Sequence, residues 1–163
     1  MLFRSVTGSR VGNDQITGDA AANQMRGQGG ADSLVGGGGA DILVGGVGID
    51  VLWGGADNDR FHFNAVAEGG DIISDFGAAG GNDDSIALQV AGFGGGLVAG
   101  ALLASQFISR ADNLAQDAND RFIFRTTDQT LWFDVDGTGV GGPRLIADLQ
   151  AGAVLTAADI LLL

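Results

Sequence analysis

The sequence predicts an all-β protein, in which a parallel β-roll of nine-residue repeats is followed by a mostly β C-terminal cap with a short helix. Three observations lead to this fold class. Residues 9–62 divide into six consecutive nine-residue units, 30 of the 163 residues are glycine against a single proline, and 19 of the 20 acidic residues are aspartate. We therefore divide the chain into an N-terminal lead-in over residues 1–8, the roll over 9–62 and the cap over 63–163.

The six units share two positions and keep them in phase without a gap. Position 6 holds an aspartate in five units and an asparagine in one, and position 8 is apolar in all six. Glycine-rich sequence of low complexity would keep no such phase. The residues at position 6 are Asp14, Asn23, Asp32, Asp41, Asp50 and Asp59, and those at position 8 are Ile16, Met25, Leu34, Leu43, Leu52 and Phe61.

Each unit is interpreted as a tight glycine turn followed by a very short strand. Side chains alternate along a strand, so position 8 points to one face and its neighbours point to the other. A single short strand buries little, whereas stacked strands form a continuous apolar ladder. With two units per coil turn, we expect Leu34 and Leu52 on one wall of the roll and Leu43 and Phe61 on the other.

The nine-residue period ends after residue 62, and shorter apolar stretches predict the cap. Strands are expected over residues 71–76, 85–90, 144–150 and 160–163, a short helix over 101–107, and a hairpin that joins 121–126 to 131–136. This half holds most of the aromatic residues. We expect it to cover the open end of the coil, because a stack of repeats needs protected edges.

Composition excludes several classes of function. The formal net charge of −12, with eight arginines and no lysine, leaves little to neutralise phosphates, so nucleic-acid binding is not expected. The absence of cysteine excludes disulfides, thiol catalysis and zinc–thiolate sites. The one histidine, His62, falls at position 9 on the outer face of the roll and is expected to be a surface side chain. The first ten residues do not form a cleaved signal sequence, and no apolar stretch is long enough to span a membrane.

The units follow the pattern GGxGxDxUx, with U apolar, which is typical of calcium-binding nonapeptides and is clearest at 36–44 and 45–53. The chain thereby resembles the RTX (repeats-in-toxin) hemolysin-type family, in particular the C-terminal β-roll and secretion region of serralysin-type proteases and related secreted proteins. The later segments FHFNAVAEGGDIISDF, DANDRFIF, LWFDVDGTG and LTAADILLL resemble the same region. The resemblance implies a secreted, extracellular bacterial protein with Ca²⁺ as its cofactor.

The chemistry of the residues agrees with calcium. Ca²⁺ takes about six to eight oxygen ligands, and a glycine turn can present carbonyl oxygens while a short aspartate reaches the ion from the same turn. Glutamate would reach too far. In a coil with two units per turn, residues 18 apart face one another, which gives the ladders Asp14–Asp32–Asp50 and Asn23–Asp41–Asp59. Without a cation each ladder stacks like charges about 4.8 Å apart, so we expect that the repeats do not fold alone.

The resemblance further implies that backbone carbonyls at positions 2 and 4 assist the carboxylate. In this sequence they belong to Gln28, Gly30, Gly37, Gly39, Gly46, Gly48, Gly55 and Asp57. The first two units lack most of the glycines, which places their sites in doubt. The best sites are therefore expected at Asp32 with Asp50 and at Asp41 with Asp59.

Positions outside this pattern have two interpretations each. Asp71 and Asp75 either close a terminal ion site or cap a turn. The segment Asp134–Gly139 imitates the start of an EF-hand loop, but Leu145 stands where a glutamate is required, which favours a hairpin turn over an ion site. Trp53 either packs against the cap, which is the favoured interpretation, or offers a platform to a sugar ring.

Three functions remain open. The first is a non-catalytic calcium-binding module that folds on Ca²⁺ after type I secretion, with Asp159–Leu163 as the C-terminal signal for the secretion machinery. The second is an extracellular module that binds a polysaccharide or another protein. The third is the C-terminal part of a larger secreted hydrolase. Its catalytic domain would precede this chain, because neither the zinc motif HExxH nor a lipase-like GxSxG occurs here.

Overall fold

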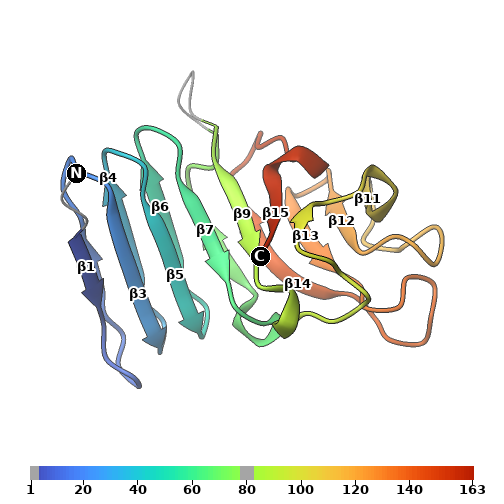
Figure 1. Cartoon of the computed structure of the whole chain (residues 1–163), viewed down its shortest axis with the longest axis horizontal. Helices are drawn as coiled ribbons and strands as arrows, with labels where there is room; N and C mark the ends of the chain where they lie inside the picture. Colours follow the sequence, from blue (N-terminus) through green and yellow to red (C-terminus); the bar gives the residue numbers. More distant parts are fainter. Residues whose placement is uncertain (1–3, 78–82) are drawn as a thin grey trace.

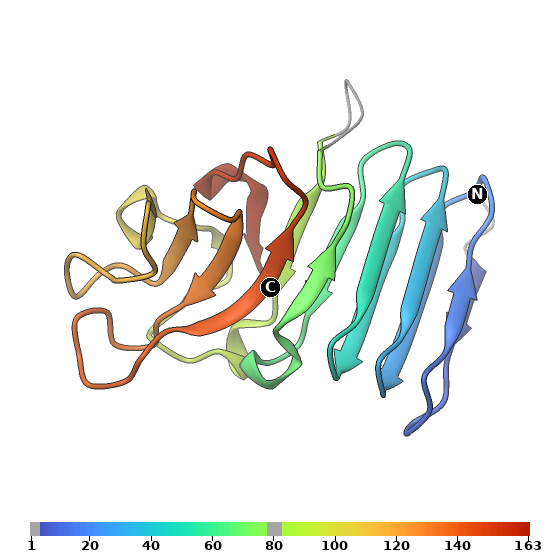
Figure 2. The same cartoon turned by 180° about the vertical axis from the view of Figure 1, so that it is seen from behind.

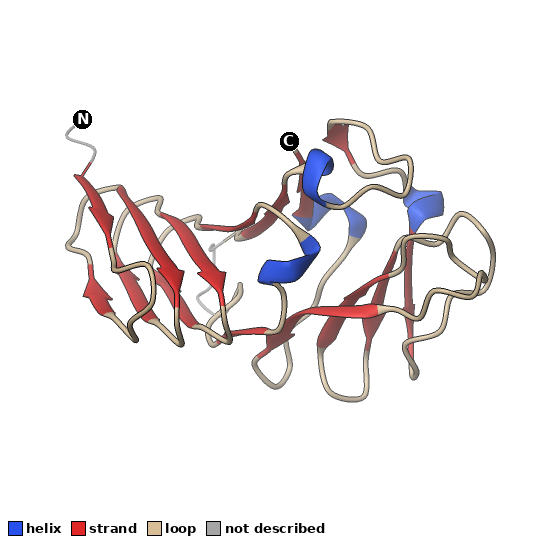
Figure 3. Cartoon of the chain, turned by 90° about the horizontal axis from the view of Figure 1, so that it is seen from below, coloured by secondary structure: helices blue, strands red, loops and turns tan. Residues whose placement is uncertain are grey.

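Two β-sheets face each other across one apolar core in the computed structural model, which describes residues 4–77 and 83–163. From β1 to β9 successive strands alternate between the sheets, so this part of the chain winds as a flattened parallel coil along its long axis (Figure 1). Within the described residues, one sheet has the order β1-β3-β5-β7-β9-β15-β10 and the other the order β11-β12-β13-β14-β8-β6-β4-β2. Figure 3 shows the two layers from below, with only short helical turns in the connections. The predicted all-β roll is confirmed.

The bounds of the elements are as follows. The strands are β1 Arg4–Thr7, β2 Gln15–Thr17, β3 Asn23–Gly29, β4 Ser33–Gly37, β5 Ile42–Val47, β6 Val51–Gly55, β7 Arg60–Phe63, β8 Asp71–Ile73, β9 Ser85–Leu88, β10 Gly100–Ala101, β11 Phe107–Arg110, β12 Phe122–Arg125, β13 Thr130–Phe133, β14 Arg144–Leu149 and β15 Ile160–Leu162. The 3-10 turns are η1 Val66–Glu68, η2 Val90–Gly92, η3 Ala104–Gln106 and η4 Ala157–Asp159.

The repeat units stack in register at a spacing of 18 residues. Leu34 of β4 lies opposite Leu52 of β6 in one sheet, and Leu43 of β5 lies opposite Phe61 of β7 in the other. All four side chains are at most 1% exposed. The two walls expected from position 8 are therefore confirmed. Because each strand is too short to be stable alone, this stacked core holds the repeats together.

The coil does not end with the repeats. β8 stacks on β6, with Ile73 opposite Leu52, and β9 stacks on β7, with Ile86 opposite Phe61. Both isoleucines are fully buried and extend the position-8 ladders. At the other end β1, which lies within the expected lead-in, pairs with β3. The limits at residues 8 and 62 are thus limits of the sequence period, while the sheets continue across them.

The C-terminal half widens one of the two sheets. β12 and β13 form the predicted hairpin, with Phe122 opposite Phe133. β14 pairs antiparallel with β13 on one side and parallel with β8 on the other, so it joins this half to the roll (Figure 2). Phe93 packs edge-on against Phe133 and brings the η2 segment onto this end of the core.

The last strand is inserted into the other sheet. β15 pairs parallel with β9 and antiparallel with β10, and the C-terminus lies near the middle of the molecule (Figure 1). Ile160 and Leu162 are each 2% exposed.

The helix expected over residues 101–107 is wrong in extent. Only the 3-10 turn η3 forms there, because Gly100 and Ala101 are already paired with β15. Within the described residues, every helix is too short to cross a membrane.

Candidate metal centre

Two ladders of carboxylates run along the roll where its turns stack. In each ladder, the backbone N–H of a position-6 residue donates a hydrogen bond to Oδ1 of the aspartate one coil turn further on. The N–H of Asp32 reaches Asp50 at 2.7 Å, and that of Asp41 reaches Asp59 at 2.8 Å. Asp14 and Asn23 donate to Asp32 and Asp41 in the same way, at 2.8 and 2.6 Å. The ladders thus lie as the spacing predicts, and their role as ligands stays a prediction.

The second oxygen of these carboxylates is left without a partner. Among the described residues, Oδ2 is buried and accepts no hydrogen bond in Asp32, Asp41, Asp50, Asp59 and Asp71. These residues are at most 2% exposed. A buried carboxylate oxygen without a donor is costly. A row of five such oxygens therefore indicates that the stacked turns are built around cations.

Glycines at position 1 keep a space open beside these oxygens. A Cβ on Gly27 would lie 2.6 Å from the carbonyl oxygen of Gly45, one coil turn further on, and closer still to Oδ2 of Asp32. A Cβ on Gly36 would likewise collide with Oδ2 of Asp41. Each space is lined by a carboxylate oxygen of its own turn and by a backbone carbonyl oxygen of the next turn. Sequence reasoning missed the position-1 carbonyls, which only the stacking of the turns brings to the carboxylates.

The turns also present the carbonyls that the resemblance implies. All eight residues at positions 2 and 4 named above have a positive φ, between 76° and 140°. Six of them are glycines, which adopt this conformation readily, whereas Gln28 and Asp57 adopt it at a cost. A Cβ on Gly48 would collide with the carbonyl oxygen of Gly30, and one on Gly55 would collide with that of Gly37. The carbonyls of one turn thus pack directly against the glycines of the next turn.

This set of oxygens fits Ca²⁺. Within residues 4–77 and 83–163, no three aspartate, glutamate or histidine side chains gather closely enough to hold a metal by themselves. Each site must therefore combine one or two carboxylates with backbone oxygens. Ca²⁺ accepts such a set at high coordination number, whereas Zn²⁺ prefers four ligands that include nitrogen or sulfur.

Burial and mutual repulsion raise the pKa values of four ladder carboxyls, those of Asp41, Asp50, Asp59 and Asp71. Burial raises the pKa of Asp59 to about 7, and the charges of Asp84 and Asp41 add to the effect. Burial likewise raises the pKa of Asp71 to about 8, with a further contribution from Asp50. The pKa values of Asp41 and Asp50 are raised by the same main cause. Without a cation the ionised form of these carboxyls is therefore disfavoured, and a bound cation would stabilise it.

The first two units depart from this arrangement, as their sequences predict. Oδ2 of Asp14 accepts hydrogen bonds from the N–H and the hydroxyl of Ser9, at 2.6 and 2.9 Å. The side-chain amide of Asn23 donates to the carbonyl oxygen of Ala21. The groups that lack partners in the later units are thus satisfied by the protein at this end. The first turn closes the ladders with hydrogen bonds.

Two carboxylates beyond the repeats continue the ladders. Oδ1 of Asp71 accepts the N–H of Asp50 at 3.0 Å, and Oδ1 of Asp84 accepts the N–H of Asp59 at 2.8 Å. They follow their ladder neighbours by 21 and 25 residues, so a search at 18 residues misses both. Asp71 was expected from its position just after the repeats, whereas Asp84 was not. The signal for Asp84 is the motif Asp-x-Ile, which repeats positions 6 and 8 of a unit.

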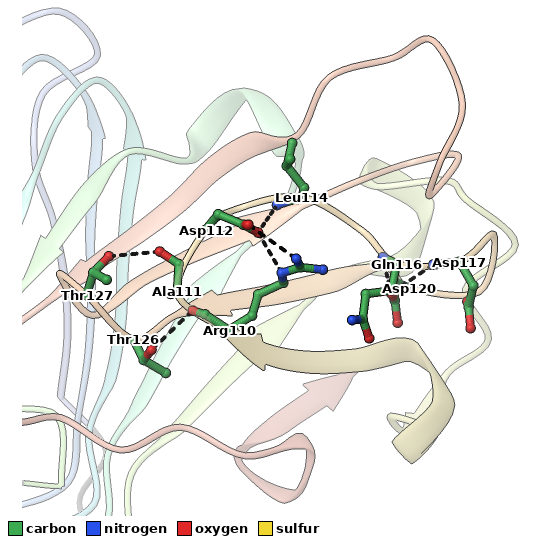
Figure 4. A network of polar contacts seen from close by, with 9 residues as sticks. All are labelled: Arg110, Ala111, Asp112, Leu114, Gln116, Asp117, Asp120, Thr126 and Thr127. Carbon is green, nitrogen blue, oxygen red and sulfur yellow. Dashed lines mark hydrogen bonds and ion pairs between the residues drawn. The ribbon is translucent and has the colours of Figure 1, made fainter.

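Acidic residues of the C-terminal half bind their own loops. Between β11 and β12, Oδ2 of Asp120 accepts the N–H groups of Gln116 and Asp117, at 2.7 and 3.2 Å (Figure 4). Nearby, Asp112 accepts hydrogen bonds from the Arg110 guanidinium and the N–H of Leu114. These carboxylates order a loop that has no regular structure. They differ in this respect from the ladder aspartates.

The segment Asp134–Gly139 lies in the connection between the antiparallel strands β13 and β14, as the hairpin interpretation predicts. Oδ1 of Asp134 accepts the N–H of Asp136 at 3.1 Å, and Oδ2 of Asp136 accepts the N–H of Gly141 at 3.2 Å. Both aspartates thus hydrogen-bond to the backbone of their own loop.

The two position-9 side chains singled out from the sequence differ in burial. Trp53 lies on the outer face of its sheet and is 37% exposed, so about a third of the residue is left uncovered. His62 is half-buried, and burial lowers the pKa of its imidazole. Its Nε2 atom is buried and has no hydrogen-bond partner among the described residues.

Comparisons with known proteins agree with this geometry. The family model described as RTX calcium-binding nonapeptide repeat matches residues 11–43 and 35–65, with four copies. The chain is similar to the solution structure of the AlgE6R3 subunit of the mannuronan C5-epimerase from Azotobacter vinelandii. The two share 27% sequence identity and a TM-score of 0.56, over 94% of this chain and 82% of that one. No curated protein matches the chain. The prediction of Ca²⁺ as the cofactor is confirmed by the family match.

Proposed function

Because this chain is a member of the RTX calcium-binding repeat family, we propose that it is a non-catalytic module that folds on Ca²⁺ after type I secretion from a bacterial cell. The observation that carries the proposal is the row of five buried Oδ2 atoms that have no donor in the described part of the chain. Bound Ca²⁺ supplies the positive charge that these turns lack, and the carboxylate oxygens without a donor coordinate it. Asp32, Asp41, Asp50 and Asp59 are the principal carboxylate ligands, and the glycine turns supply carbonyls.

The electrostatics support the coupling of folding to calcium. Ordering a glycine-rich backbone costs much conformational entropy, and a net charge of −12 opposes compaction. A ligand that binds only the folded state supplies the balance through linkage. In the bacterial cytosol, where free calcium is scarce, the chain would stay unfolded and could be threaded through a channel. Outside the cell the roll would close and resist return.

The C-terminus supports the secretion half of the proposal. Asp159–Leu163 is an acidic residue followed by apolar ones, as in the signal that type I machinery leaves uncleaved. In the folded chain Ile160 and Leu162 are buried between β9 and β10. The same residues would thus be read by the machinery while the chain is unfolded and would become the last strand of the cap outside.

The test is export of the chain through a compatible type I system. Removal of residues 159–163 is expected to abolish export. Because the truncation also removes a buried strand, the matched control is Leu88→Ala, which weakens the same packing from the opposite strand, where Leu88 lies beside Leu162. The control should still be exported. Normal export of the truncated chain would show that the segment is structural only.

A second candidate is favoured by one observation, the likeness to a subunit of a mannuronan C5-epimerase. On this view the chain is an accessory module of a secreted enzyme and binds a polysaccharide, with the exposed Trp53 as a platform for a sugar ring. Retardation of the calcium-loaded chain in gels that contain polymannuronate tests it. Retardation that Trp53→Ala abolishes would favour this candidate, and migration unaffected by the polymer would reject it.

A further inference from the structure

The two ladders end differently where the repeats meet the C-terminal half. Asp71 ends one ladder and Asp84 ends the other, and each accepts the N–H of the preceding ladder residue through Oδ1. They are 0% and 4% exposed. Because they hold equivalent places in the coil, the surroundings of Oδ2 decide whether each of them takes an ion.

At Asp84 the protein satisfies the carboxylate by itself. Its Oδ2 accepts the N–H of Gly77 at 2.8 Å. On the same side of the coil, the two carboxylate oxygens of Asp75 accept hydrogen bonds from the N–H groups of Gly54 and Gly55, at 2.9 and 2.8 Å. Backbone donors thus compensate these two carboxylates. This end of the ladder is closed with hydrogen bonds, in the same way as the first turn is closed by Ser9.

At Asp71 no such donor exists among the described residues. Oδ2 is buried without a partner, as in the ladder aspartates of the repeats. The turn that leads to it, at Gly69, stacks on the C-terminal half, since a Cβ on Gly69 would lie 2.5 Å from the carbonyl oxygen of Leu145. Gly27 stacks on the carbonyl of Gly45 inside the roll, where its Cβ would also meet Oδ2 of Asp32. At the junction, the carboxylate oxygen of Asp71 that lacks a donor within the described residues thus follows by two residues a glycine whose backbone packs directly on the C-terminal half.

We infer that Asp71 forms one further Ca²⁺ site beyond the repeats, on one side of the coil only, and that this site fastens the C-terminal half to the roll. The inference rests on the proposed calcium-dependent folding. β8 begins at Asp71 and is the strand that pairs with β6 of the repeats and β14 of the C-terminal half. A cation held at Asp71 would therefore couple the ordering of β14 to that of the roll. On the other side, the hydrogen bonds of Asp84 hold the start of β9, which pairs with β7 and β15, without an ion.

The test counts calcium ions bound to the full chain at saturation, by equilibrium dialysis with ⁴⁵Ca²⁺. Asp71→Asn keeps an oxygen for the Asp50 N–H and removes the charge, and is expected to bind one ion fewer than the wild type. Asp84→Asn is the matched control and should bind the wild-type number. Asp71→Ser, counted in the same way, serves if Asp71→Asn does not fold. Amide hydrogen exchange gives a second readout, in which Asp71→Asn should lose protection in β14 and keep it in β4 and β5.

Asp32→Asn separates this inference from the proposed function. If Asp32→Asn loses an ion and Asp71→Asn does not, the site at Asp71 is refuted while calcium binding by the repeats stands. If Asp71→Asn and Asp84→Asn each lose one ion, the asymmetry between the two ladder ends is wrong. If no variant loses an ion, the proposed function fails together with the inference.

Discussion

Gly36→Ala should weaken calcium-dependent folding, although alanine is normally the better residue in an ordered chain. Gly36 lies at position 1 of its unit and does not have a positive φ, so its backbone accepts alanine. The added Cβ would lie closer than 3.0 Å to Oδ2 of Asp41 and to the carbonyl oxygen of Gly54. It would thus fill the space that we assign to an ion.

The size of the effect follows from two opposing contributions. Overpacking of this kind costs about 1–3 kcal/mol. The reduced entropy of the unfolded chain returns about 0.4–1 kcal/mol. A net loss of about 1–2 kcal/mol, shared by about two cooperative ions, raises the calcium midpoint of folding about two- to fivefold at about 1.4 kcal/mol per tenfold change for each ion.

The matched control is Gly38→Ala in the same turn. A Cβ there would meet only Ala20, whose Cα lies at an ordinary contact distance of 3.6 Å. The unfolded chains of both variants lose the same freedom, so the midpoint of Gly38→Ala should stay unchanged or fall slightly. Calcium titrations followed by far-UV circular dichroism measure both midpoints. Equal midpoints for the two variants would refute the assignment of the oxygen-lined space to an ion.

Three further predictions concern the ladders and the core. The repeats should bind Ca²⁺ cooperatively and weakly, with a dissociation constant on the order of 10⁻⁴–10⁻³ M per site. Asp50→Ala should raise the calcium midpoint of folding more than Asp14→Ala, because Ser9 already donates hydrogen bonds to Asp14. Equal shifts of the midpoint in a calcium titration would contradict the assignment of the ladders. In the presence of chelator, lowering the pH from about 8 to 5 should increase the β-structure of the chain. The raised pKa values of Asp59 (about 7) and Asp71 (about 8) stabilise the fold fully below the usual value of 3.8, and this stabilisation is lost as the pH rises through 7 and 8. Circular dichroism that shows less β-structure at the lower pH would contradict this prediction. In saturating calcium, Leu43→Ala should cost about 2–5 kcal/mol in urea unfolding, whereas Val47→Ala, at a side chain 60% exposed, should change little.

The period of the sequence was sufficient to predict the roll. A repeat of nine residues with an apolar position 8 allows one arrangement in which Leu34 meets Leu52 and Leu43 meets Phe61, because only a coil of two units per turn buries all of them. The same phase places the aspartates of the two ladders 18 residues apart. The turn and strand preferences within each unit agree with the stacking of the units, so the structure of one unit predicts that of the next.

The sequence period could not predict the ends of the ladders, because they depend on stacking and not on spacing. Asp84 follows Asp59 by 25 residues, yet it occupies the place that an 18-residue repeat would fill. The loop length is free to vary wherever the strand that follows still buries its apolar residue, as Ile86 does. Sequence reasoning likewise assigned Asp71 and Asp75 the same two alternatives. Their hydrogen-bond partners separate them, since Asp75 has two N–H donors and Oδ2 of Asp71 has none within residues 4–77 and 83–163.

The most direct test of the account is far-UV circular dichroism of the full chain at about pH 9, above the raised pKa values of Asp59 and Asp71, with millimolar calcium and then with an excess of chelator. The stacked, ionised carboxylates predict a β spectrum in calcium, its replacement by a coil spectrum on chelation, and full recovery when calcium is restored. A chelated sample that keeps its complete β spectrum at this pH would contradict the claim that calcium is required for the fold.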